Sequence, residues 1–238
     1  MIQENTSKNT INVVVELVSK VSPTKVLDIP CGSGSLTEKL NSRGIAVISS
    51  DIENMIKTNQ ENFIQSDMDK QLCFENESFD AVVSIDGIEH IRRQFDFIGE
   101  CRRVLKRNGT LILSTPNITS IRSRWRYFLT GFHNKCKVPL DEKNPSPLHH
   151  ISMISFPELR YILHTNGFRV TSIKSNRYKS ISMLYIPLIP IILLVTFFVF
   201  KKELKSNSEK KIGTEIFSQI FNPSLMFGET TILTATKI

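Results

Sequence analysis

The chain is predicted to fold as an α/β domain built on a mostly parallel sheet. Short apolar segments rich in valine and isoleucine alternate with amphipathic segments, and the connections between them are short. Such alternation is typical of parallel strands joined by helices that cover both faces of a sheet. The 238 residues are enough for one such domain with a sizeable core.

The first half of the chain supplies five of the expected strands. A helix over residues 10–21 comes first and ends before Pro23. Strands are expected at residues 25–29, 45–51, 62–67, 79–85 and 110–115, and helices at 35–40 and 92–107. The longer helix is expected to bury Phe95, Ile98, Val104 and Leu105 and to end at Asn108-Gly109.

The second half departs from simple alternation. A helix is expected over residues 118–131, and a second one over 156–167 has Pro157 in its first turn and Gly167 at its end. Strands at residues 168–175 and 229–238 complete the sheet. The insertion between them holds an apolar segment, 181–200, about as long as a membrane-spanning helix.

Composition and charge bear on three questions: the kind of partner, the state of the cysteines and the presence of a signal peptide. The formal charge of +7 permits an anionic partner, but the sequence contains no recognisable nucleic-acid-binding module, so no nucleic acid is expected. The four cysteines are far apart and form no C-x-x-C pair, which indicates reduced cytosolic thiols. The first ten residues are polar, which does not fit a signal peptide.

The stretch "VLDIPCGSGSL", residues 26–36, ends the first strand in a glycine loop. Gly32 and Gly34 let a ligand approach the backbone, and the amides of the following helix point at that ligand. A pyrophosphate loop would read G-x-G-x-x-G, whereas Thr37 stands at the third glycine position. Asp28 also suits a cationic ligand better than a diphosphate, although a plain turn remains the simplest alternative.

Five stretches, in order, resemble class I S-adenosylmethionine-dependent methyltransferases. They are "VLDIPCGSGSLTEKL", "VISSDI", "FIQSDMD", "FDAVVSIDGIEHI" and "CRRVLKRNGTLILSTPN". The resemblance covers about residues 10–175 and the last strand. It implies a Rossmann-like, seven-stranded, mostly parallel sheet with helices on both faces, an antiparallel last strand, and an apolar helical insertion between strands six and seven.

The resemblance also implies S-adenosylmethionine as cofactor and a set of residues that bind it. Asp28, Cys31, Gly32 and Gly34 would shape the methionine end, Asp51 with Ile52 the ribose end, and Asp67 with Met68 the adenine end, with Ile85 at the fourth strand tip. Considered apart from the family motifs, Asp51 is more simply explained as a helix cap, and Asp67 as a solvated acid in a loop. Pro30 departs from the family pattern, because it replaces a glycine and removes an amide donor.

Two pairs of residues are candidates for the chemistry. Glu89 and His90 follow the fourth strand, where an acceptor would meet the methyl group, and His90 is the first candidate base. The rivals are His149 and His150, which precede the helix before strand six, as in glycan- and lipid-linked methyltransferases of this superfamily. Both pairs have a plain alternative as capping or rim residues. No metal is expected, since no further ligands have suitable spacing.

Two segments suggest a membrane surface. The helix at 118–131 carries Arg122, Arg124 and Arg126 among aromatic residues, which suits phosphate or a membrane, or else a solvated helix with its apolar side in the core. The apolar segment 181–200 contains Pro187 and Pro190, which favour an in-plane or re-entrant form. Since the strands flanking it are expected to pair, a single crossing of the bilayer is excluded. A buried cover or a homodimer interface is the alternative.

The sequence therefore predicts a methyltransferase that O-methylates a membrane-associated glycan or a lipid-linked or isoprenoid acceptor. Its cofactor domain would comprise residues 1–175 and 228–238, with an acceptor-site cap at 116–155 and a membrane-associating or interface insertion at 176–227. The expected location is the cytoplasmic face of a membrane, peripheral or monotopic. A non-catalytic membrane adaptor and an NAD-dependent oxidoreductase are the alternatives.

Overall fold

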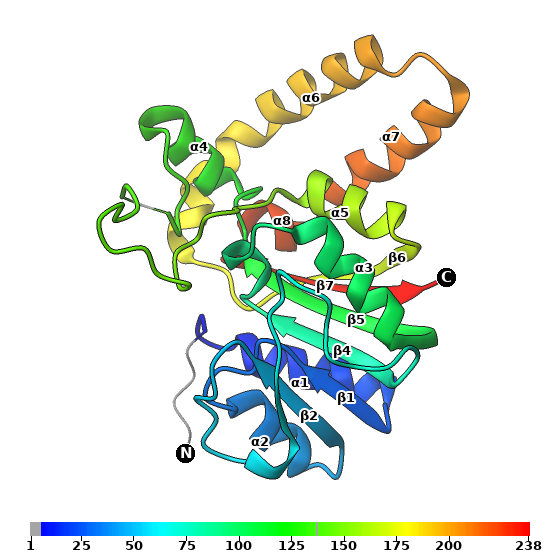
Figure 1. Cartoon of the computed structure of the whole chain (residues 1–238). Helices are drawn as coiled ribbons and strands as arrows, with labels where there is room; N and C mark the ends of the chain where they lie inside the picture. Colours follow the sequence, from blue (N-terminus) through cyan, green and yellow to red (C-terminus); the bar gives the residue numbers. More distant parts are fainter. Residues whose placement is uncertain (1–5, 137) are drawn as a thin grey trace.

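A computed structural model describes residues 6–136 and 138–238. Its centre is a seven-stranded sheet in the order β3-β2-β1-β4-β5-β7-β6, in which only the β7 pairings are antiparallel (Figure 1). The strands are β1 (Lys25–Asp28), β2 (Ala46–Asp51), β3 (Phe63–Gln65), β4 (Phe79–Ile85), β5 (Leu105–Pro116), β6 (Phe168–Ser175) and β7 (Thr230–Lys237). The predicted fold class, including the antiparallel last strand, is confirmed.

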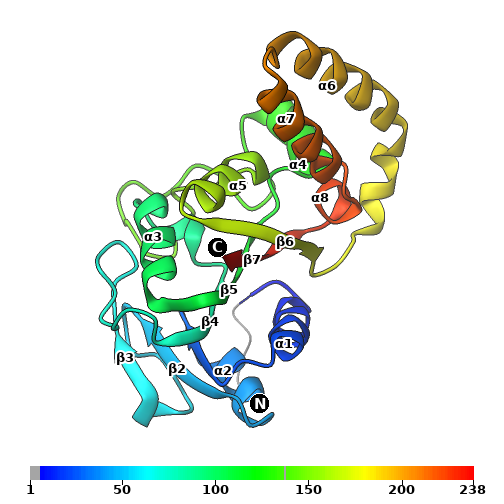
Figure 2. The same ribbon diagram turned by 90° about the vertical axis from the view of Figure 1, so that its right-hand side faces the viewer.

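Helices cover both faces of this sheet. The helices against it are α1 (Thr10–Val21), α2 (Ser35–Asn41), α3 (Gln94–Val104) and α5 (Phe156–Thr165). The alternation of side chains along a strand sorts the core into two layers, because Val26 of β1 packs with α1 and α2 whereas its neighbour Leu27 packs with α3 and α5. Figure 2 shows α1 and α3 on opposite sides of the strands.

The junction between α3 and β5 differs from the prediction. The helix ends at Val104 rather than near Arg107, and β5 begins at once with Leu105, which pairs with Phe79 of β4. Asn108, at φ 60°, and Gly109 lie in an irregular stretch of β5 and do not terminate the helix. The inward position expected for Phe95 is also wrong: this side chain is exposed, and Phe97 occupies the core.

The insertion between β6 and β7 forms a helical hairpin that extends away from the sheet (Figures 1 and 2). It consists of the 3-10 helix η3 (Ser180–Leu188), α6 (Ile189–Glu203), α7 (Asn207–Ile220) and α8 (Pro223–Phe227). The continuous helical segment Ser180–Glu203 is long and apolar enough to span a membrane, and its most apolar window has no buried residue. A capping box of Ser206 and Glu209 begins the return helix.

The strand order places the candidate residues at one edge of the sheet. β1, β2 and β4 run parallel and adjacent, so the residues that follow Asp28, Asp51 and Ile85 lie on the same side. The chain reverses its direction of progress across the sheet at β1, and this is where ligands of open α/β sheets bind.

Candidate functional site

Asp28 ends β1 and fastens the start of α2 to the sheet. Its carboxylate accepts a hydrogen bond from the Thr37 hydroxyl at 2.8 Å, and Thr37 also contacts the Ser49 hydroxyl of β2 at 2.9 Å. Burial raises the pKa of Asp28 to about 7. Thr37, which stands where a pyrophosphate loop has its third glycine, is therefore a structural partner of Asp28.

The tip of β2 and the glycine loop are joined by Asp51. One carboxylate oxygen accepts from the backbone N–H of Gly32 at 2.9 Å, and the other accepts from the N–H of Ile52 at 2.8 Å. Burial raises the pKa of Asp51, against the lowering effect of these two bonds. Gly32 has φ +51°, and a Cβ built on it would meet nothing within 4 Å, so the space beside this carboxylate is open.

The other residues expected to bind the cofactor differ in how deeply they are buried. Cys31 is buried, and burial raises the pKa of its thiol, so it is not a nucleophile here. Met68 is buried in the core, whereas Ile52 is exposed and Ile85 half-buried. Asp67 is half-buried and forms an ion pair with Lys70 at 3.2 Å.

Pro30 has a steric partner that the sequence did not reveal. The Ile29–Pro30 bond is cis, and the proline ring lies where a Cβ on Gly87 would have to be. The loop after β1 and the loop after β4 therefore touch at this point. Gly87 accommodates the proline that replaces the usual glycine, and any larger residue there would have to displace the ring.

Glu89 is the most deeply buried acid near the strand tips. Its side chain is 0% exposed; one carboxyl oxygen accepts from the Thr115 hydroxyl at 2.9 Å, and the other has no partner among the described residues. Burial raises the pKa of Glu89 to about 8. At neutral pH Glu89 is thus mainly protonated and is able to donate a hydrogen bond.

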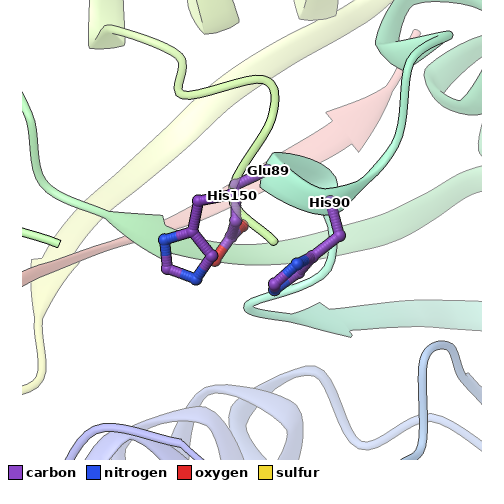
Figure 3. Close-up of side chains that lie close together, drawn as sticks. All are labelled: Glu89, His90 and His150. Carbon is purple, nitrogen blue, oxygen red and sulfur yellow. The ribbon is translucent and has the colours of Figure 1, made fainter. Parts of the chain in front are cut away.

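His90 and His150 face Glu89 from two segments (Figure 3). His90 lies in a short 3-10 helix, η2 (Ile88–His90), and its Nδ1 is 3.1 Å from the carbonyl oxygen of His149. Because a carbonyl only accepts, Nδ1 carries the proton and Nε2 keeps its lone pair. The rings of His90 and His150 are 4.7 Å apart, and burial lowers the pKa of both imidazoles.

The two predicted candidate pairs, Glu89-His90 and His149-His150, thus meet, but His149 contributes only its backbone. Its carbonyl orients His90, and the backbone N–H of Ser152 donates to the Glu89 carbonyl oxygen at 3.0 Å. Gln94 bridges the same two segments, because its side-chain amide donates to the carbonyl oxygens of Ile88 and Ser152. Side-chain chemistry at this point is left to Glu89, His90 and His150.

Asp86 belongs to the same group and was missed in the sequence. It follows β4 at φ 47°, accepts from the Ser114 hydroxyl at 2.8 Å, and accepts from the Thr6 hydroxyl at 2.5 Å. Its charge raises the pKa of Glu89 and favours protonation of His90 and His150. The stretch "SIDGIEH" contains this acid three residues before Glu89, and that spacing was the available signal.

The group also offers ligands for a cation. One atom from each of Glu89, His90 and His150 lies within 4.8 Å of the other two. The sequence argument against a metal, that the His149-His150 pair lacks further ligands, does not hold in space. A carboxylate and two neutral imidazoles are suitable ligands for a divalent metal ion, and the same atoms are suitable for accepting a proton.

Comparison with known proteins finds similar sequences for part of the chain. Residues 27–113 match the family described as "Methyltransferase domain". The chain is 35% identical over 114 residues to the mitochondrial ubiquinone biosynthesis O-methyltransferase of Bos taurus, a match that spans 42% of this chain and 31% of that protein. A bacterial enzyme of the same name, from Histophilus somni, is 29% identical over 109 residues, which span 40% of this chain and 46% of that one.

Solved structures share the whole fold at low identity. A methyltransferase from Archaeoglobus fulgidus has a TM-score of 0.57 at 20% identity, covering 96% of this chain and 95% of its own. Phosphoethanolamine N-methyltransferase 2 from Haemonchus contortus, solved with S-adenosyl-L-methionine, has a TM-score of 0.54 at 15% identity and covers 95% and 52%. At these identities the structural likeness establishes the fold.

Proposed function

We propose that the chain is a class I methyltransferase that transfers a methyl group from S-adenosylmethionine to a hydroxyl of a membrane-associated acceptor. The match of residues 27–113 to the family described as "Methyltransferase domain" supports the methyltransferase assignment. The observation that carries the proposal is that two groups of residues lie at the carboxyl ends of neighbouring strands. One is the open glycine loop held by Asp51, and the other is the Glu89–His90–His150 group after β4.

The residues at the β1 and β2 tips fit this cofactor. Gly32 leaves open space beside the Asp51 carboxylate, which retains lone pairs to accept from the ribose hydroxyls after its two backbone bonds. Cys31, Gly32 and Gly34 would border the methionine end, and Asp67 with Met68 the adenine end. When bound, S-adenosylmethionine supplies an electrophilic methyl group on its sulfonium sulfur.

His90 is the proposed base for the acceptor hydroxyl. Its Nε2 carries the free lone pair, since Nδ1 donates to the His149 carbonyl oxygen. Its lowered pKa keeps the ring neutral at physiological pH, and Asp86 stabilises the imidazolium that forms when His90 takes the proton. Protonated Glu89 donates a hydrogen bond into the same space, and the loop at 147–152 covers it.

The acceptor class is proposed from two lines of support. Relatives found by sequence similarity are named ubiquinone biosynthesis O-methyltransferases, and the match spans about a third of the Bos taurus protein. Independently, the apolar hairpin suits an acceptor that resides in lipid. We therefore favour an isoprenoid-linked phenol, with lipid-linked glycans as the other acceptors that a surface enzyme would reach.

The hairpin is proposed to lie on the membrane rather than to cross it once. Strands β6 and β7 flank it and pair antiparallel, so both of its ends are fixed at the same sheet edge. The apolar side chains of η3 and α6 are exposed, and Lys201 with Lys202 follows them. On α4 (Ile121–Thr130), Trp125, Phe128 and Leu129 are exposed as well, so only Ile121, at the start of that helix, has a buried apolar side chain.

Calorimetric titration tests the cofactor assignment. The protein is expected to bind S-adenosylmethionine and S-adenosylhomocysteine but not NAD, and Asp51→Ala is expected to weaken both bindings by about 10- to 100-fold, as for loss of hydrogen bonds to a carboxylate. Absence of binding to either sulfur compound would overturn the proposal. Binding without turnover of any phenol would favour a non-catalytic adaptor, and affinity for NAD would favour an oxidoreductase.

Deletion of residues 182–210 tests the membrane assignment separately. The shortened protein is expected to leave the membrane fraction of lysed cells while still binding S-adenosylmethionine. A shortened protein that sediments with membranes as well as the intact chain would exclude the hairpin as the anchor.

A further inference from the structure

A cavity of about 100 Å³ lies beside α4, and no residue of the glycine loop lines it. Its walls come from the residues after β5, from α4, from the start of η3 and from the turn before β7. The polar side chains that line it include Arg122, Ser123, Lys135, Lys179, Ser182 and Glu229. None of them belongs to the predicted cofactor or catalytic residues.

The cavity is strongly cationic in spite of its carboxylate. Lys179 and Lys135 both pair with Glu229, at 2.6 and 3.7 Å, and Arg177 pairs with it from outside. Burial raises the pKa of Glu229, but the bonds from Arg177 and Lys179 outweigh it and bring the pKa down to about 2. The carboxylate therefore stays charged. Its single negative charge offsets only one of the three positive charges that pair with it.

Arg122, on α4, adds a further positive charge to the lining. Its side chain forms no ion pair with any residue of 6–136 or 138–238. Ser182 also lines the cavity, as do Ser120 and Ser123, whose hydroxyls already bond to the Asn117 carbonyl oxygen and to His133 Nδ1. Guanidinium, ammonium and hydroxyl donors around one small space are the groups that bind phosphate oxygens.

The surroundings of the cavity indicate what carries the phosphate. Helices α4 and η3 lie side by side and form two of its walls. Both expose apolar side chains next to it: Phe128 and Leu129 on α4, Met183 and Leu184 on η3. A cationic cavity bordered by exposed apolar helices suits an amphiphile with an anionic head and apolar chains.

We propose that this cavity binds the phosphate of a lipid headgroup, held by Arg122, Lys179 and Lys135. The lipid part of the assignment rests on the proposed membrane surface, whereas the phosphate part depends only on the cavity. Bound there, the headgroup would fix the height and orientation of the domain on the bilayer. The charge of Lys135 also acts on Glu89 and His150, lowering the pKa of both groups.

Vesicle sedimentation with the full-length chain tests the proposal. Vesicles of phosphatidylcholine alone are compared with vesicles that also contain phosphatidylglycerol, using the wild type and the double variant Arg122→Gln/Lys179→Gln. The matched control, Lys20→Gln/Arg43→Gln, removes two exposed charges on the far side of the domain. The cavity variant is expected to lose about tenfold or more of its affinity for the anionic vesicles, and the control less than about twofold.

A thermal-shift assay with glycerol 3-phosphate separates the headgroup from the bilayer. Stabilisation of the wild type but not of the cavity variant supports a site that binds phosphate in the absence of a membrane. Stabilisation by anionic vesicles alone supports the site in its bilayer setting. Equal losses in the two double variants, or no loss in either, would overturn the proposal. A wild type that responds to glycerol 3-phosphate but binds no vesicle would overturn the lipid assignment and the membrane surface, while leaving cofactor binding untouched.

Discussion

Replacing Glu89 by glutamine is expected to make the protein more stable at alkaline pH. The side chain is 0% exposed, its hydrogen bond comes from a neutral hydroxyl, and burial raises its pKa from 4.5 to about 8. In the unfolded chain the same carboxyl ionises near its ordinary pKa. Between these two values the folded protein holds a proton that the unfolded chain has released, so the free energy of unfolding falls as pH rises.

The size of the effect follows from the two pKa values. A displacement from 4.5 to about 8 corresponds to about 5 kcal/mol of unfolding free energy, lost progressively across that range and constant above it. Glutamine has nearly the same shape, keeps an oxygen for the Thr115 hydroxyl, and does not titrate. The difference in stability between Glu89→Gln and the wild type should therefore grow with pH and level off above about 8.

Urea denaturation at several pH values from 4.5 to above 8 measures this difference. A chelator is included, because a bound cation would hold Glu89 ionised. Asp28, whose pKa of about 7 also exceeds its ordinary value, contributes the same slope to both proteins and cancels in the comparison. Two stability curves that run parallel over this range would show that Glu89 is not a buried neutral acid.

Three further outcomes are expected. His90→Gln should lower kcat on a soluble isoprenoid phenol by about 10²- to 10⁴-fold with unchanged cofactor affinity, and an unaltered kcat would exclude His90 as the base. Gly34→Ala should cost about 1–3 kcal/mol of stability in urea, because its φ is +85° and its Cβ would press on an isoleucine side chain. Gly44→Ala, at φ +76° in open space, is the control and should cost less. Leu194→Glu should weaken vesicle binding by about tenfold, whereas Tyr161→Glu on α5, equally exposed, should not; equal effects would count against the hairpin as the membrane face.

The order of strands and helices could be predicted because each carries a local signal. Valine-rich segments such as Phe79–Ile85 and capped helices such as Phe156–Thr165 have the same bounds in sequence and structure, within a residue or two. The end of α3 could not be placed, since Leu105 is apolar and fits a helix or a strand equally well. Pairing with Phe79 decides it, and that contact is distant in sequence.

The candidate site was predicted residue by residue but not as a group. The sequence named Glu89, His90 and His150, yet it treated the Glu89-His90 pair and the His149-His150 pair as rivals, because loop 147–152 is far from β4 along the chain. Docking of that loop by backbone hydrogen bonds brings the pairs together. The cationic cavity was beyond prediction for the same reason, since Arg122, Lys179 and Glu229 come from three separate segments.

The position of β7 between β5 and β6 has a consequence for biosynthesis. β6 reaches the sheet only through β7, so it has no partner strand until residues 230–237 have been translated. By the spacing of these segments, the apolar residues of α6 are translated about thirty residues before β7. They therefore emerge while the sheet still lacks its last two strands. An exposed hydrophobic segment on a nascent chain is a substrate for chaperones or for a nearby bilayer. If the hairpin binds a membrane as proposed, this order of translation allows it to reach the bilayer before the sheet is complete.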